Sequence, residues 1–304
     1  MKALRTIAGL TVAALSIAAA SPALGVTLAN RVFVSQRSGN DANACNNILT
    51  PCQTFAGAVV QLNPGGEAIV LDSGGYGPVT ITQSLTIEAP PGVLAFIHPP
   101  SGDAITISAG ATDKVILRGL TLNGGSGNGI TISSVGKVYV ENCVISGFAD
   151  DGIWFDASGE LLMKDTISRG NLEGIVLNQG RGLIEHCRFE GNGDTGVAVD
   201  GSDVTVRDSV CAGNGGDGFF AQSGGAENST LNVYECVSTN NAVGFYAVKI
   251  GTGSVTARAA NSSISENVGA GIAVAGAAFE SLGNNFVRGN SPNVNGSITV
   301  VLGQ

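Results

Sequence analysis

The sequence predicts an all-β solenoid, a single chain that coils through about ten rungs of three short strands each. The first observation is a glycine that recurs at successive steps of 23, 22, 22, 22, 26 and 27 residues, at Gly129, Gly152, Gly174, Gly196, Gly218, Gly244 and Gly271. A step that stays in the low twenties is typical of a solenoid, in which each repeat packs on the next one. The second observation is composition, because 45 of the 304 residues are glycine and helical apolar spacing is missing from the repeats.

The third observation is the alternation of apolar and polar side chains in runs of three to five residues, as at 138–141, 153–156 and 197–200. A period of two indicates strands that bury one face. Neighbouring rungs of such a coil lie about 4.8 Å apart, so residues one repeat apart become neighbours in space.

Residues 1–25 are predicted to form a secretory signal peptide. Lys2 and Arg5 precede an apolar run over 7–20 that is too short to span a bilayer, and a small-x-small pattern follows at 23–25. A buried core helix is the alternative. Export predicts a secreted, periplasmic or cell-surface protein, and no later segment is expected to span a membrane.

The charge balance bears on partners. The formal net charge is −9, and removal of Lys2 and Arg5 leaves 13 basic against 24 acidic residues, or −11. A chain this acidic is not expected to bind nucleic acid or anionic lipid. The sequence does not indicate an oligomeric state.

Residues 26–304 are predicted to form one domain, with a lead-in and cap over 26–64 and regular repeats over 115–275. A first strand is expected at 32–34. Cys45 and Cys52 bracket a loop in an exported chain, which predicts a disulfide between them. A short capping helix follows Thr54, a candidate N-cap. Its apolar positions have helical spacing: Phe55, Ala58, Val59 and Leu62.

Aligning the repeats defines two columns at one corner of the coil. The first column holds mostly residue types that tolerate the left-handed backbone region: Gly119, Asn142, Asp165, His186, Asp208, Glu235 and Asn261. The next residue in each repeat is small in all but one case and should point inward: Leu120, Cys143, Thr166, Cys187, Ser209, Cys236 and Ser262. Three of its cysteines lie about 10 Å apart, too far for disulfides. We expect these three and Cys211 to be buried free thiols.

With these features in place, the chain resembles the right-handed parallel β-helix proteins of the pectate-lyase-like group. The three-strand rungs match that group, as do the bends at Asn142, Asp165, Asp208 and Asn261, and the segment 54–62 is similar to its N-terminal cap. The resemblance covers residues 32–304 and implies the fold. It leaves function open, because the fold hosts lyases, hydrolases, epimerases, phage tailspikes and adhesins. The group's catalytic residues map onto no position of this sequence.

One candidate catalytic set comes from the bend column. Asp165, His186 and Asp208 occupy it on three consecutive rungs, so one imidazole would lie between two carboxylates about 5 Å away on each side. Such a set could act as a general acid and base or hold a metal weakly. The alternative is that the bend only needs residues that tolerate its backbone.

A candidate metal site comes from the residues before the periodic glycine. Asp151, Glu173 and Asp217 form an acidic ridge there. Several carboxylates are what Ca²⁺ requires, so Ca²⁺ is the one cofactor that the sequence suggests. The alternative is a corner of solvated turns.

A candidate binding surface comes from the outward positions of the last strand of each repeat. Trp154, Phe220 and Tyr246 share one column, which also holds Val176 and Ala198. Two residues further along the chain from Trp154, Val176 and Ala198 come Asp156, Asn178 and Asp200. Aromatic rings beside hydrogen-bonding groups suit the stacking of sugar rings and the binding of their hydroxyls. The alternative is that loops or a partner cover the aromatics.

These features favour a secreted protein that binds or processes an extracellular polysaccharide. If the protein is an enzyme, we expect a polysaccharide lyase or a glycoside hydrolase. The alternative is a non-catalytic surface, adhesion or structural solenoid.

Overall fold

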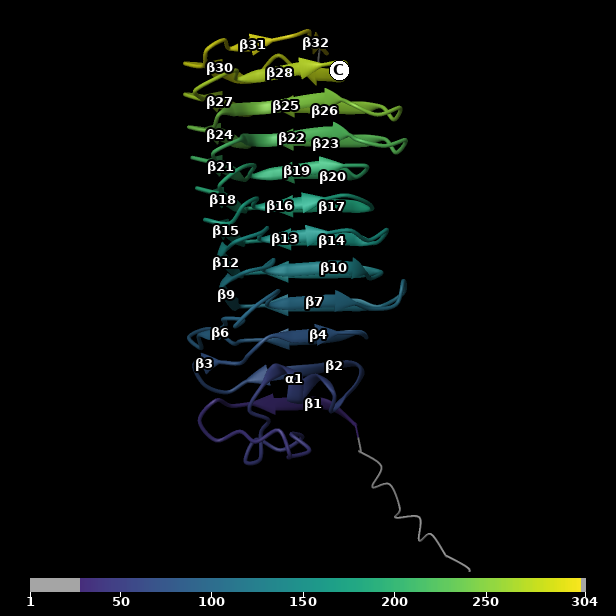
Figure 1. The fold of residues 1–304 in the computed structure, drawn as a ribbon, viewed down its shortest axis with the longest axis vertical. Coiled ribbons are helices and arrows are strands. Elements are labelled where there is room, and N and C mark those ends of the chain that lie inside the picture. Colours follow the sequence, from purple (N-terminus) through teal and green to yellow (C-terminus); the bar gives the residue numbers. More distant parts are fainter. Residues whose placement is uncertain (1–27, 302–304) are drawn as a thin grey trace, which may run out of the picture.

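The computed structural model describes residues 28–301, so the predicted signal peptide lies outside the described residues. The chain coils as a stack of rungs along the long axis of the molecule (Figure 1). Its strands form three parallel sheets that run the length of the stack. The predicted all-β solenoid of about ten rungs is confirmed.

Sheet A holds twelve strands. In order along the stack these are β1 (Ala29–Val34), β2 (Leu62–Val70), β5 (Leu85–Glu88), β8 (Lys114–Arg118), β11 (Lys137–Glu141), β14 (Glu160–Lys164), β17 (Arg181–Glu185), β20 (Asp203–Arg207), β23 (Ser229–Tyr234), β26 (Val255–Ala260), β29 (Ala278–Ser281) and β32 (Thr299–Val300).

Sheet B holds ten strands. They are β3 (Gly74–Gly75), β6 (Ala95–Ile97), β9 (Leu120–Gly125), β12 (Val144–Phe148), β15 (Ile167–Arg169), β18 (Arg188–Glu190), β21 (Val210–Ala212), β24 (Val237–Thr239), β27 (Ser263–Ser265) and β30 (Phe286–Arg288).

Sheet C also holds ten strands. They are β4 (Val79–Ile81), β7 (Ile105–Ser108), β10 (Ile130–Ser134), β13 (Ile153–Phe155), β16 (Ile175–Leu177), β19 (Val197–Asp200), β22 (Asp217–Ser223), β25 (Val243–Lys249), β28 (Ile272–Ala275) and β31 (Val294–Asn295).

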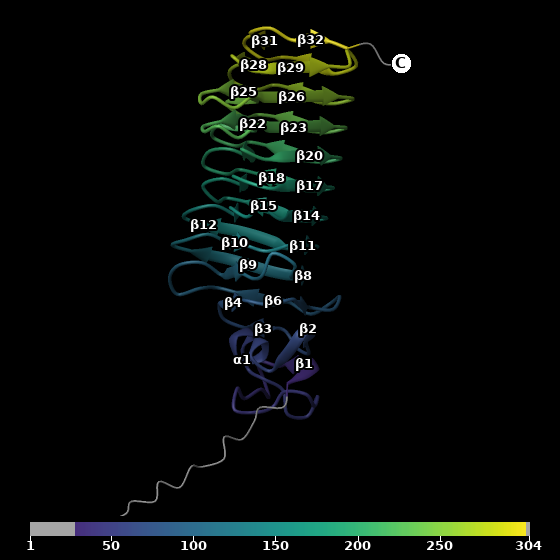
Figure 2. The same ribbon diagram turned by 90° about the vertical axis from the view of Figure 1, so that its right-hand side faces the viewer.

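The N-terminal end of the coil carries the predicted cap. The helix α1 (Phe55–Val59) lies beside the first rungs, at the end opposite the C-terminus (Figure 2). The hydroxyl of Thr54 caps it by accepting a hydrogen bond from the backbone N–H of Gly57 at 3.0 Å. The expected helical position at Leu62 is wrong, because Leu62 begins β2. Its side chain is nevertheless buried, since the strand also turns that position toward the core.

The cysteine predictions are confirmed. Cys45 and Cys52 are joined by a disulfide, with their Cα atoms 5.1 Å apart. The other four cysteines are buried and free: Cys143, Cys187, Cys211 and Cys236. Burial raises the pKa of the Cys143 thiol to about 11, so it behaves as a small apolar group and not as a nucleophile.

The core follows from the alternation within each strand. In β13, Ile153 and Phe155 point inward and are fully buried, whereas Trp154 between them points outward. The register places Ile153 between Ile130 and Ile175, so like positions stack from rung to rung. Each such side chain contributes roughly 1.5–3 kcal/mol by leaving water. Among residues 28–301, no helix is long and apolar enough to cross a membrane.

The corner between sheets A and B has the predicted left-handed backbone. Every residue of the bend column has a positive φ, from 49° at Asp208 to 71° at Gly119. Glu235 adopts it too, with a φ of 56°, although its residue type is not among those that favour this region.

This geometry makes Asn142 a test of the corner. Asn142→Gly should change the free energy of unfolding little, whereas Asn142→Val should lower it by about 1–2 kcal/mol, because a β-branched residue resists positive φ. Urea unfolding of the two variants measures the difference. Equal stabilities would mean that the left-handed bend does not constrain this position.

The corner between sheets B and C contains a ladder that the sequence did not predict. One asparagine per rung is buried there and donates a side-chain hydrogen bond to the asparagine of the next rung: Asn171, Asn192, Asn214, Asn241 and Asn267. The Nδ2 to Oδ1 distances are 2.9 Å from Asn192 to Asn214 and from Asn214 to Asn241. The ladder therefore gives these buried side-chain amides hydrogen-bond partners within the protein.

Candidate functional site

The outer face of sheet C carries the predicted aromatic column. Pairing of the strands places Trp154 of β13, Val176 of β16, Ala198 of β19 and Phe220 of β22 side by side in that order. Tyr246 of β25 follows, and its ring centroid lies 5.6 Å from that of Phe220. All three aromatics point away from the core and are partly exposed, as the alternation predicts.

A hollow of about 190 Å³ lies on this face. Trp154 and Phe220 stand at its two ends, and Val176 and Ala198 between them, each only 6% exposed, form an apolar floor. Glu173 lines the edge toward sheet B. Three polar residues line the opposite edge: Asn178, Asp200 and Gln222.

A second hollow of about 490 Å³ adjoins the first at the corner between sheets C and A. Asn178 and Asp200 line both hollows and form the border between them. Asp156 lies on one side, and the loop between β22 and β23 brings Glu227 to the other. That loop projects from the side of the stack (Figure 1). We call the two hollows together the sheet C groove.

Hydrogen bonds fix the polar side of the groove. The amide of Gln179 donates to Asp156 at 2.6 Å, and that of Gln222 donates to Asp200 at 3.0 Å. The backbone N–H of Gly224 donates to the other oxygen of Asp200 at 2.9 Å. The carboxylates of Asp156 and Asp200 are thus held in place before any ligand arrives, which lowers the entropic cost of binding.

The predicted acidic ridge lies along the edge of sheet C nearest sheet B. Asp151 and Glu173 occupy the same position on neighbouring rungs. Thr195 occupies it on the next rung, and Asp217 on the rung after that. Burial, reinforced by the neighbouring carboxylates, raises the pKa of Asp151 to about 6 and that of Glu173 to about 7. Burial, followed by repulsion from Asp194, raises the pKa of Asp217 to about 7.

The ridge does not draw together like a metal centre. Within residues 28–301, no group of three or more His, Cys, Asp or Glu side chains is arranged to hold a metal ion. Asp151 instead accepts a hydrogen bond from the backbone N–H of Glu173 at 3.2 Å. Calcium binding by Asp151, Glu173 and Asp217 stays a prediction.

The raised pKa values predict that the fold becomes less stable as the pH rises. A carboxyl whose pKa is higher in the folded than in the unfolded chain stabilises the fold below its unfolded pKa, and this stability is lost as the pH rises through the folded value. For Glu173 that window runs from its ordinary 4.5 to about 7. Urea unfolding should therefore give a larger free energy near pH 5 than near pH 8.

Glu173→Gln should reduce the difference in the free energy of unfolding between pH 5 and pH 8 by on the order of 1–2 kcal/mol, since one pKa unit corresponds to about 1.4 kcal/mol. Asp203→Asn, at an exposed position that begins β20, should leave it unchanged. An unaltered profile in the Glu173 variant would show that this carboxyl is not desolvated.

The predicted trio of Asp165, His186 and Asp208 is brought together by the structure. The Nδ1 atom of His186 lies 3.9 Å from Asp165, and its Nε2 atom lies 3.8 Å from Asp208. These distances exceed a hydrogen bond, and the side chains are 54%, 56% and 41% exposed for His186, Asp165 and Asp208. The trio lies on the corner between sheets A and B and does not line the groove. Its catalytic role stays a prediction.

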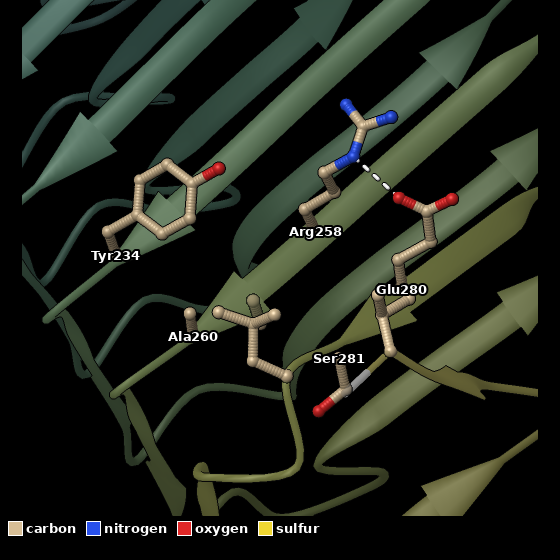
Figure 3. A pocket seen from close by; sticks show the side chains of 8 residues that line it. Tyr234, Arg258, Ala260, Glu280 and Ser281 are labelled. Atoms are coloured by element: carbon tan, nitrogen blue, oxygen red, sulfur yellow. Dashed lines mark hydrogen bonds and ion pairs between the residues drawn. The ribbon is translucent and has the colours of Figure 1, made fainter. Parts of the chain in front are cut away.

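Another pocket, of about 220 Å³, lies near the C-terminal end of sheet A (Figure 3). Arg258 is its only basic residue and is already paired, with its Nε atom 2.6 Å from Glu280 and its Nη1 atom 3.2 Å from Asn232. Tyr234 and Ser281 also line it. Because Arg258 is already bonded to Glu280 and Asn232, and the final strands around this pocket are short, it is a weaker candidate for a ligand site than the sheet C groove.

Five of the six predicted binding residues line the groove, whereas Tyr246 lines neither hollow. The sequence did not assign Glu173, Gln179 or Glu227 to this site. Glu173 was assigned to the acidic ridge alone, because its offset from Trp154 does not show that the two border one hollow. Glu227 lies in a loop outside the repeat, where no column predicts its neighbours. The added residues of that repeat, visible as the longer step of 26 from Gly218 to Gly244, were the available signal.

Comparison with known proteins supports the fold. A family model described as "Right handed beta helix region" matches residues 34–203 and 103–258. No curated protein matches the sequence.

Three solved structures share the coil. An alginate lyase from Paenibacillus sp. strain FPU-7 is similar with a TM-score of 0.62 and 15% identity, over 89% of this chain and 100% of that one. A pectate lyase is similar with a TM-score of 0.58 and 15% identity, over 91% and 78%. The A-module of a mannuronan C-5 epimerase from Azotobacter vinelandii is similar with a TM-score of 0.52 and 14% identity, over 79% and 92%.

Proposed function

We propose, from the premise that this chain belongs to the right-handed β-helix family, that it is a secreted protein that binds an extracellular carbohydrate chain in the sheet C groove. The observation that carries the proposal is the pair of outward aromatics, Trp154 and Phe220, at the two ends of an apolar floor. They lie three rungs apart, or about 14 Å, which suits an extended oligosaccharide lying along the coil axis.

The chemistry of the groove fits a sugar chain. Aromatic rings offer wide, rigid apolar area at low entropic cost, and the apolar faces of sugar rings can stack on them. Asn178, Asp200 and Gln222 lie along one side, where they can accept and donate hydrogen bonds to hydroxyl groups. A mostly apolar concavity with a few placed polar groups is the usual form of a ligand site.

The similar structures support a carbohydrate-related role, because they are named as lyases and an epimerase of polysaccharides. This support is an analogy at the level of the fold. Secretion is supported by the disulfide between Cys45 and Cys52, which persists in oxidising compartments.

If the protein also cleaves its glycan, Glu173 is the residue we propose for proton transfer. It lines the hollow beside Trp154, and burial raises its pKa to about 7. A carboxyl in that range can give up and take back a proton near neutral pH. Cleavage would then appear as new chain ends that Glu173→Gln abolishes while binding persists.

A panel of soluble oligosaccharides tests the proposed function. Trp154 is the only tryptophan in the chain, so its fluorescence reports directly on the groove. We expect at least one extracellular-type oligosaccharide to change the emission saturably and to shield the indole from acrylamide. If none binds, the adhesion or structural alternative replaces the proposal.

A further inference from the structure

All charged side chains that line the sheet C groove are acidic. Glu173 lies on the edge toward sheet B, and Asp156, Asp200 and Glu227 lie toward sheet A. Among the described residues that line the two hollows, none is Lys, Arg or His. The groove thus offers a ligand four carboxylates and no cation.

Several basic residues of the coil form ion pairs on another face. Along the outer face of sheet A, acidic and basic side chains alternate from rung to rung and pair across neighbouring strands. The pairs include Arg118 with Glu88 and Glu141, Lys137 with Glu160, Arg207 with Glu185, and Arg258 with Glu280. These paired cations lie on sheet A and line neither hollow of the groove.

We propose that the sheet C groove selects a glycan whose sugar rings carry no carboxylate or sulfate groups. This inference rests on the proposed function and names its substrate class. An acidic sugar bound between Trp154 and Phe220 would place its charge within the space bordered by Glu173 and Asp200. Juxtaposed like charges in a partly desolvated site oppose binding. Uncharged rings meet no such penalty, and their hydroxyls are the donors that Asp156 and Asp200 can accept.

The arrangement of the carboxylates strengthens this selection. Hydrogen bonds from Gln222 and Gly224 hold Asp200 in place, so it cannot simply swing away from an acidic ligand. Two of the similar structures are a pectate lyase and an alginate lyase, whose named substrates are acidic polymers. The shared coil would then serve a different substrate class.

A titration with oligosaccharides of matched length tests the selection. Uncharged gluco-, manno- and xylo-oligosaccharides are compared with oligogalacturonate and oligomannuronate, with Trp154 fluorescence as the readout. The measurement is made near pH 8, above the pKa of about 7 at which Glu173 loses its proton. Each ligand is measured with a chelator and again with millimolar Ca²⁺, because a bridging cation could reverse the preference.

We expect the affinity for at least one uncharged oligosaccharide to exceed that for either oligouronate by at least about tenfold, with and without Ca²⁺. Oligouronates that bind as tightly as the uncharged chains, in either condition, would overturn the substrate class and leave the proposed function standing. If no oligosaccharide binds at all, the proposed function fails and this inference fails with it.

A pair of variants ties the selection to the carboxylates. The double variant Glu173→Gln and Asp200→Asn should narrow the preference for uncharged over acidic chains by about tenfold. Asp203→Asn removes the same kind of charge from an exposed position of sheet A and should leave the preference unchanged. A preference that survives in the double variant would mean that these carboxylates do not set it.

Discussion

Replacing Asn241 by alanine should lower the free energy of unfolding by roughly 3–5 kcal/mol, because several buried partners lose their hydrogen bonds at once. The Asn241 side chain is fully buried. Its Nδ2 atom donates to the carbonyl of Cys211 and to Oδ1 of Asn267, each at 3.1 Å. Its Oδ1 atom accepts from the backbone and side-chain nitrogens of Asn214 at 3.0 and 2.9 Å.

The adjacent asparagine provides the control. Asn240 is exposed and has a φ of 56°, a conformation that glycine adopts without strain, so Asn240→Gly should change stability by less than about 1 kcal/mol. Chemical unfolding of both variants measures the contrast. Equal and small losses would show that water can replace the ladder, and that this corner is more open than its burial indicates.

The coil itself was predictable because its causes are local. The alternation of apolar and polar residues with a period of two determines which side chains of β13 point inward. The glycine step of about 22 residues determines how one rung aligns with the next. The same alignment placed Asn142 at a left-handed bend and Cys143 in the inner corner, and both positions are confirmed. Those predictions needed only the repeat and the properties of single residue types.

The asparagine ladder was missed because a Gly-Asn pair at the end of a strand also fits an exposed turn. Whether Asn192 faces water or the core depends on the path of the chain between sheets B and C. Neither the two-residue alternation within strands nor the glycine step near 22 residues specifies that path. The helix end was misplaced for a related reason. Leu62 fits helical spacing after Phe55, but its pairing opposite Ala29 in sheet A decides its conformation.

The sequence could predict which residues share the outward column of sheet C, but not that they border a cavity. The aromatic positions follow from strand alternation, whereas the hollow depends on the shorter side chains of Val176 and Ala198 between the two aromatics. The raised pKa of Glu173 has the same origin. Its spacing in the sequence shows that it lies near other carboxylates, but only the packed rungs show that it is desolvated.

Trp154→Ala should weaken the binding of any glycan accepted by the groove by about thirtyfold or more, the effect of removing a central aromatic anchor worth about 2 kcal/mol. Trp154 forms one end of the hollow, so its loss removes both the stacking surface and the wall that keeps water from the floor. Val176→Ala, which only deepens the floor between the anchors, should have a much smaller effect.

Calorimetry is the suitable measurement, because the variant lacks the only tryptophan and its fluorescence signal. Tyr139→Ala is the matched control, since Tyr139 is an outward aromatic of β11 in sheet A and does not line the groove. The Trp154 side chain points away from the core, so the fold of the variant should be retained, as its unfolding curve will show. A variant that folds normally and still binds as tightly as the unchanged protein would place the glycan elsewhere on the coil and remove the sheet C groove as the binding site.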